Sequence, residues 1–157
     1  MTELRNARPE ELRFLTELCL RSKAVWGYDD VFMEACRNEL TLTLEDLAST
    51  HMQVAADGDI PLGIAQIGVD GREANLLKLF VEPKCLRVGI GMQLLSWATA
   101  KAASLGALRL IIDADPDAVP FYRRNGAKLE GSAPSGSIPG RLLPKLAIDL
   151  TAEALPR

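Results

Sequence analysis

The sequence has 157 residues, of which 48% are hydrophobic and 25% are charged, and its formal net charge is −3. This balance is typical of a globular protein with a substantial core, and we expect one domain over residues 1–157. The slight acidity and the lack of a basic stripe argue against nucleic-acid binding.

Metal-binding side chains are sparse in the sequence. Cys19, Cys36 and Cys85 have no metal-binding spacing, and His51 is the only histidine, so no metal site is expected. The odd number of thiols favours a reducing, cytoplasmic location. No signal-like segment opens the chain and no apolar run approaches the ~20 residues that span a bilayer, so no membrane contact is expected.

The first fifty residues predict one strand and two helices. Residues 2–8 have strand character, and Pro9 suits the first turn of a helix that continues to about residue 23. Residues 26–30 break this helix, and either Asp29 or Asp30 is expected to cap a second helix over residues 31–40. Residues 41–50 are ambiguous between a loop and a short helical turn.

Three strand-like runs follow, with Asp-Gly turns between them. The runs cover residues 51–56, 61–69 and 74–83, and the Asp-Gly pairs that separate them favour hairpins. We therefore expect an antiparallel meander whose third strand, from Ala74 to Glu82, is the most buried.

The C-terminal half alternates helices and strands. A helical stripe of apolar residues begins behind a glycine loop and stops at Gly106. A buried strand from Ala107 to Asp113, a helix that ends at Gly126, a small strand near residues 127–130 and a final strand over 141–150 follow. The expected fold class is one mixed α/β domain.

The glycine loop carries the clearest functional signal. It joins a buried strand to a helix N-terminus, where free backbone N–H groups and the helix dipole favour a phosphate, and Gly89 and Gly91 leave room for one. A plain turn is the structural alternative. The Walker pattern fails because no Lys-Ser or Lys-Thr follows Gly91. The dinucleotide fingerprint has Leu94 at its third glycine, although Asp113 stands where a ribose-binding acid belongs.

Two separated motifs resemble the acyl-CoA-binding half of the GNAT superfamily of N-acetyltransferases. In the segment LFVEPKCLRVGIGMQLL, Gly89 and Gly91 match the pyrophosphate loop Gln/Arg-x-x-Gly-x-Gly/Ala, whereas Leu86 stands at its first position. In the segment DPDAVPFYRRNGAKLEG, the second motif of the superfamily is matched by Ala118, Phe121, Tyr122 and Gly126.

The resemblance implies a three-layer fold with helices on both faces of a mixed sheet. The sheet would open between the strand from Leu79 to Val81 and the strand from Ala107 to Asp113. Acetyl-CoA would be the cofactor, with its pantetheine arm paired to the first strand and its pyrophosphate on the glycine loop. The implied cofactor-binding residues are Leu79, Phe80, Val81, Arg87, Val88, Gly89, Ile90, Gly91, Met92 and Asp117.

N-acetyl transfer needs a neutral amine, a polarised thioester and a proton for the departing thiolate. The resemblance implies that Tyr122 lies beside the thioester sulfur as the proton donor, with packing under the cofactor as the structural alternative. Asp117 is expected to contact the cofactor, to cap a helix, or both. The sequence offers no clear base, since Asn75 cannot act as one and Glu73 is expected to be a solvated hairpin residue.

The acceptor pocket is expected from segments outside the cofactor half. Trp26 and Tyr28 lie in the helix break beside two carboxylates, with aromatic core packing as the alternative. The polar segment GSAPSGSIPGRLLP contributes Ser135, Ser137 and Arg141 as possible contacts.

The expected function is acetyl-CoA-dependent N-acetyl transfer, by direct attack in a ternary complex, to a primary amine of a small molecule or a protein. A non-catalytic acyl-CoA-binding domain that acts as a sensor or an assembly subunit is the alternative, supported by Leu86 and by the missing Glu base. A nicotinamide-dependent oxidoreductase is a distant third. The acceptor and the oligomeric state, including a homodimer, are left open.

Overall fold

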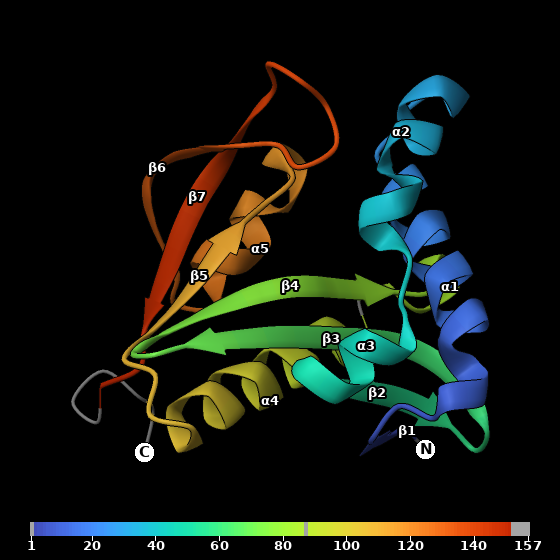
Figure 1. The fold of residues 1–157 in the computed structure, drawn as a ribbon, viewed down its shortest axis with the longest axis horizontal. Coiled ribbons are helices and arrows are strands. Elements are labelled where there is room, and N and C mark those ends of the chain that lie inside the picture. Colours follow the sequence, from blue (N-terminus) through green and yellow to red (C-terminus); the bar gives the residue numbers. More distant parts are fainter. Residues whose placement is uncertain (1, 87, 152–157) are drawn as a thin grey trace.

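The computed structural model describes residues 2–86 and 88–151. Within these ranges, seven strands form one mixed sheet in the order β1-β2-β3-β4-β5-β7-β6 (Figure 1). The strands are β1 (Thr2–Arg5), β2 (His51–Asp57), β3 (Ile60–Asp70), β4 (Glu73–Val81), β5 (Arg109–Asp113), β6 (Lys128–Pro134) and β7 (Leu142–Asp149).

Helices cover both faces of this sheet. Helices α1 and α2 pack on one face of the sheet, and α4 and α5 pack on the other (Figure 1). The α-helices are α1 (Leu12–Ala24), α2 (Asp30–Leu40), α3 (Leu44–Ser49), α4 (Ile90–Ser104) and α5 (Val119–Arg124). Three short 3-10 helices lie between the other elements, namely η1 (Pro9–Glu11), η2 (Pro83–Cys85) and η3 (Pro116–Ala118).

Local signals set most of these boundaries. Of the two candidate caps for α2, Asp29 is the one that acts, because its carboxylate accepts a hydrogen bond of 2.8 Å from the backbone N–H of Phe32. The ambiguous segment before β2 forms α3, which Thr43 and Asp46 start with a reciprocal capping box. The Asp-Gly turns close two antiparallel hairpins, so the predicted meander of β2, β3 and β4 is confirmed. The prediction that its third strand is the most buried is wrong, because β4 has a smaller share of buried residues than β2 or β3.

The helix predicted after β5 is shorter than expected. The chain first makes η3 and only then α5, with Pro116 and Pro120 each in a first turn, where a missing N–H costs least. Asp117 lies inside η3 and is exposed, while Asp115 and Ala118 hold the cap positions. The prediction that Asp117 caps this helix is therefore wrong. The strand predicted near residues 127–130 continues to Pro134, because it pairs with β7 along its length.

The sheet divides the interior into two apolar layers. On the first face, α1 and α2 pack against β2 and β3, with Phe80 of β4 at the margin. On the other face, α4 packs against β3, β4 and β5, and Tyr122 of α5 joins this layer. Because side chains alternate along a strand, each layer takes every second residue of β4 outside its bulge.

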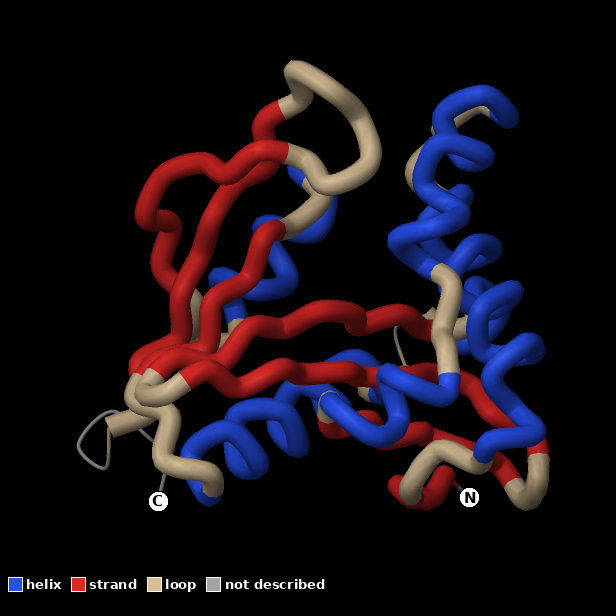
Figure 2. Tube along the Cα trace, viewed as in Figure 1, coloured by secondary structure: helices blue, strands red, loops and turns tan. Residues whose placement is uncertain are grey.

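The two halves of the sheet separate between β4 and β5. These strands are parallel and pair only where residues 73–75 face residues 109–111. Past that point β4 runs on to Val81 and β5 to Asp113 without further pairing between them among the described residues. The two strands diverge from a shared point and form a V (Figure 1). Figure 2 shows α1 and α2 across the open end of this V from β5. The predicted opening is confirmed, although β5 begins at Arg109 rather than at Ala107.

Candidate functional site

The glycine loop ends at the N-terminus of α4. Gly89 is the N-cap residue and has φ +87°, a left-handed conformation that glycine adopts without strain. A Cβ added to Gly89 would meet no atom of a described residue within 4 Å, so the described part of the chain leaves the space in front of the first turn of α4 open on this side. The unpaired N–H groups of that turn face the same end of the helix.

Gly91 has a different role from Gly89. A Cβ at this position would lie 3.4 Å from the ring of Phe121 and 3.8 Å from the side chain of Val81. These are ordinary van der Waals distances, so Gly91 lies where α4, α5 and β4 meet behind the loop, and a small side chain would fit there.

The other predicted cofactor residues divide by burial. Val88 and Met92 are more than half exposed, whereas Ile90 is buried in the core beneath the loop. Arg87 lies outside the described residues. Val81 is also buried on this side, with Leu79 partly buried beside it, whereas Phe80 is partly buried on the opposite face of the sheet.

One backbone donor of the splayed part of β4 is already engaged. The N–H of Val81 donates to the side-chain oxygen of Ser22 on α1 over 3.3 Å. This bond is at the long end of the normal range. A ligand that pairs with Val81 must therefore replace a weak contact to a serine.

Tyr122 is buried in the layer beneath β5. Its ring packs edge-on against Phe121 at a centroid distance of 5.2 Å, and its hydroxyl makes no hydrogen bond to a described residue. Burial, and after it the negative charge of Asp115, raise the pKa of this phenol well above its usual value. The hydroxyl therefore keeps its proton through neutral and moderately alkaline pH.

Five side chains, each from a different element or connection, meet near the end of β5, and we call them the Asp115 cluster. The carboxylate of Asp115 accepts hydrogen bonds from Tyr28, from Lys23 at 3.0 Å and from Arg141 at 3.2 Å. Arg141 also donates to the hydroxyl oxygen of Tyr28 at 2.7 Å. Phe32 completes the cluster, because its ring stacks on that of Tyr28 with centroids 3.9 Å apart.

The ionisation of the cluster follows from these contacts. Burial favours the neutral form of Asp115, but the hydrogen bonds from Tyr28, Lys23 and Arg141 outweigh it and hold the pKa below its usual value. Burial and the bond to Asp115 raise the pKa of Tyr28. Lys23 and Arg141 also lie over the two stacked rings, with the Arg141 guanidinium 4.9 Å from the centre of Phe32. The cluster therefore joins two cations, one carboxylate and two neutral aromatic rings.

The predicted acceptor residues are brought together only in part. Tyr28 and Arg141 are in direct contact, although 113 residues separate them. Trp26 is exposed in the turn after α1 and makes no polar side-chain contact with a described residue. Ser135 accepts backbone N–H groups of Ser137 and Ile138, so it holds the turn of its own loop.

Three members of the cluster were missed by sequence reasoning. Lys23, Phe32 and Asp115 lie within the three segments that were expected to be helices, and no sequence feature marks them as members of a site. The segment GSAPSGSIPGRLLP was expected to be a polar loop before the final strand, but β6 continues to Pro134 and only residues 135–141 connect β6 to β7. Ser137 of this connection donates a hydrogen bond to Glu39 of α2, and so adds a second link across the same gap.

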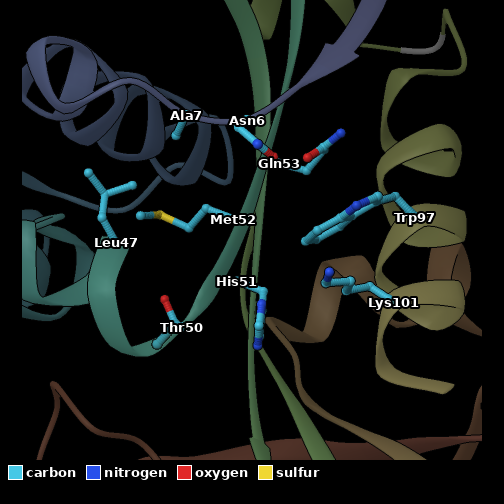
Figure 3. Close-up of a pocket in the computed structure, with 9 residues that line it drawn as sticks. All are labelled: Asn6, Ala7, Leu47, Thr50, His51, Met52, Gln53, Trp97 and Lys101. Atoms are coloured by element: carbon cyan, nitrogen blue, oxygen red, sulfur yellow. The ribbon is translucent and has the colours of Figure 1, made fainter. Parts of the chain in front are cut away.

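Two surface cavities are lined by residues outside the Asp115 cluster. One cavity of about 390 Å³ surrounds the free edge of β2, with Met52 and Leu47 on one side and Gln53 and Trp97 on the other (Figure 3). It exists because β1 pairs with β2 only from Val54 onward. A larger groove of about 960 Å³ runs from Met92 on α4 past the end of α5 to β6 and β7.

Two negative findings apply to the described ranges. They contain no group of three or more His, Cys, Asp or Glu side chains that could hold a metal ion. Among them, no helix is both long and apolar enough to cross a membrane.

The site as a whole combines two features. An open helix N-terminus beside a split sheet provides backbone donors for an anionic ligand, and the Asp115 cluster closes the other side of the split.

Comparison with known proteins gives the family. The acetyltransferase (GNAT) domain matches residues 8–132, most of the chain. The chain belongs to the GNAT acetyltransferase family. A search of curated proteins finds no significant match.

Solved structures of GNAT proteins share the fold. The PaiA N-acetyltransferase of Thermoplasma acidophilum, solved with coenzyme A, is 20% identical with a TM-score of 0.80, over 95% of this chain and 99% of that one. A GCN5-related N-acetyltransferase from Rhodopseudomonas palustris is 21% identical with a TM-score of 0.78, over 95% and 96%. An aminoglycoside 6′-N-acetyltransferase, also solved with coenzyme A, is 18% identical with a TM-score of 0.69, over 99% and 98%. At these identities the likeness establishes the GNAT fold and not an acceptor.

Proposed function

We propose that the chain is an acetyl-CoA-dependent N-acetyltransferase, with residues 1–157 acting as one domain, and that it acetylates a primary amine of a small molecule or a protein. The observation that carries this proposal is the opening between β4 and β5 with the unobstructed N-terminus of α4 at its mouth. A gap between strands beside an anion site suits a ligand that has an amide-bearing arm and a pyrophosphate.

The residues present fit the cofactor. Open space in front of Gly89 and the free N–H groups of the first turn of α4 favour a pyrophosphate. The predicted set for this role is unchanged, with the backbone from Val88 to Met92 on the phosphates and the strand from Leu79 to Val81 along the arm. Arg87 and Asp117 are also proposed to bind the cofactor. The bound cofactor would supply the acetyl thioester.

Tyr122 is the proposed catalytic residue. Its side chain is buried, its hydroxyl makes no hydrogen bond to a described residue and its raised pKa keeps it protonated at neutral pH, so it holds a proton that a departing thiolate can accept. Deprotonation of the amine is assigned to water, because the start of β4 offers only the amide of Asn75 and the exposed Glu73.

The proposed acceptor residues are Trp26, Tyr28, Ser135 and Arg141. Tyr28 and Arg141 form the wall that faces the end of β5, and Ser135 sets the conformation of the loop that carries Arg141. Trp26 is exposed and free to contact a larger acceptor.

A non-catalytic coenzyme A-binding domain is the second candidate. One observation favours it, namely that Leu86 occupies the position of a polar loop residue and is 43% exposed. Release of free thiol from acetyl-CoA over a mixed panel of amines distinguishes the two functions. We expect amine-dependent thiol release, and binding of coenzyme A without it would favour the second candidate.

A further inference from the structure

A buried lysine lies on the splayed strand, on the same face as α1. Lys78 is 9% exposed, and its ammonium donates one hydrogen bond, 3.0 Å long, to the side-chain oxygen of Gln66 on β3. It takes part in none of the ion pairs between described residues. A lysine ammonium has three donors, so two remain for another partner.

The orientation of Gln66 is fixed by its other neighbour. The amide nitrogen of Gln66, which is 1% exposed, donates to the hydroxyl oxygen of Thr50 over 3.0 Å. The hydroxyl of Thr50 in turn donates to the backbone carbonyl of Asp46. The chain of bonds therefore turns the carbonyl oxygen of Gln66 toward Lys78 and holds the ammonium in place.

Lys78 marks the border between the covered and the open part of this face. Phe80, two residues further along β4, packs under α1 and α2. Leu77 lies on the same face because β4 is bulged here, and its side chain sits 3.4 Å from the Cβ position of Gly68. Leu77 is almost half exposed. Asn75 is exposed beyond it. A molecule in the open part thus has the ammonium of Lys78 at its edge.

The charges around the open part are unequal. The Asp115 cluster has two cations, Lys23 and Arg141, for one carboxylate. Asp113 and Lys145 are register partners of opposite sign on β5 and β7. Glu39 of α2 lies across the same gap, so the charge left without a carboxylate partner among the described residues is that of Lys78, and a buried charge without a counter-ion is unfavourable.

We propose that Lys78 is the binding site for a carboxylate of the acceptor, so that the substrates are amines that also bear a carboxylate. This inference rests on the proposed function, since the open face is where that function requires the acceptor. The carboxylate would take the two remaining donors of Lys78, while the amine lies toward the opening between β4 and β5.

The test uses pairs of amines in which an amide replaces the carboxylate, and each rate is expressed per concentration of neutral amine because this replacement also lowers the pKa of the amine. Glycine, β-alanine and γ-aminobutyrate are compared with glycinamide, β-alaninamide and γ-aminobutyramide as acceptors of acetyl-CoA. For the best pair we expect kcat/KM to favour the carboxylate by roughly tenfold or more, the effect of one charged hydrogen bond. Lys78→Met should remove this preference and leave the rate for the amide within about twofold, whereas Lys78→Arg should keep part of it. Lys101→Met on α4 is the matched control and should keep the full preference.

A second measurement separates this inference from the proposed function. The N-acetylated forms of the same compounds are added with coenzyme A, and the melting temperature is recorded. A shift with the carboxylates alone that Lys78→Met abolishes supports the anion site, even if no amine is turned over. No difference between carboxylates and amides, or a difference that survives Lys78→Met in a variant shown to be folded by circular dichroism, overturns it.

Discussion

The hydroxyl of Tyr28 donates a hydrogen bond to the carboxylate of Asp115 and so joins the turn between α1 and α2 to the segment after β5. The two residues are 87 positions apart and stand on opposite sides of the split in the sheet. With Lys23 and Arg141 on the same carboxylate, this bond sets the distance between the two walls of the open face.

Asp115→Asn should destabilise the protein by about 2 kcal/mol, because it leaves two partly buried cations without their anion. Asp113→Asn, two residues earlier and exposed, is the control and should change the free energy of unfolding by less than about 0.5 kcal/mol. Urea unfolding at neutral pH measures both. Equal effects of the two substitutions would show that the cluster contributes little.

The same carboxylate predicts a pH dependence. The pKa of Asp115 is lower in the folded protein than its usual value of 3.8, so its contribution is fully present above that value. The contribution should be lost as the pH falls below 3.8 and through the folded-state pKa. The stability difference between the wild type and Asp115→Asn should therefore be constant above about pH 5 and shrink in acid. A difference that grows in acid would contradict the assignment.

Gly89→Val should weaken coenzyme A binding by more than tenfold, since a branched side chain would occupy the open space before α4. Gly106→Val is the matched control, because Gly106 also has a positive φ, of +92°, with no atom within 4 Å of its Cβ position. Both substitutions should cost about 1–2 kcal/mol of stability through backbone strain. Calorimetric titration with coenzyme A should show lost affinity only in Gly89→Val, and an equal loss in both would indicate strain alone.

Coenzyme A should stabilise the fold by ligand linkage. At ~100 times the dissociation constant the gain is about 2.7 kcal/mol, visible as a higher melting temperature. NADH at the same concentration should give no shift. Equal shifts with both ligands would remove the acyl-CoA assignment in favour of a dinucleotide site.

Tyr122→Phe should lower kcat by about 100-fold, at the low end of general-acid effects because a thiolate is a good leaving group. The KM for acetyl-CoA should change little, since the ring and its packing against Phe121 remain. The effect should diminish as the pH approaches ~8.5, where a thiol ionises readily without a donor. Full turnover in the variant at neutral pH would show that Tyr122 only packs.

The glycine loop could be predicted because its signals are local, whereas the opening of the sheet was expected only from the resemblance of two motifs to the GNAT superfamily. Gly89 needs a positive φ at a helix N-terminus, and the apolar runs before and after it have the periodicity of a strand and a helix. The order of the elements then follows from turn chemistry at Asp-Gly pairs and at Gly106.

The Asp115 cluster could not be predicted in full because it is assembled by the tertiary fold. Lys23 and Asp115 are 92 residues apart, and neither has neighbours that mark it as functional. Tyr28 and Arg141 were selected only because each lies in a break between elements. Lys78 was hidden in the apolar run LLKLFV, where the bulge in β4 that sets its position leaves no mark in the sequence. Asp117 failed as a cap because Pro116 and Pro120 favour two short turns over one helix.

The most direct test of the proposed function follows the acetyl group itself. Acetyl-CoA with an isotopically labelled acetyl group is incubated with the wild-type protein and the amine panel, and mass spectrometry records the acetylated amine beside the free thiol. We expect one labelled N-acetyl product for each thiol released, with both reduced together in Tyr122→Phe. Thiol release without an acetylated amine, or binding of coenzyme A with no consumption of acetyl-CoA by any amine, would contradict the proposal.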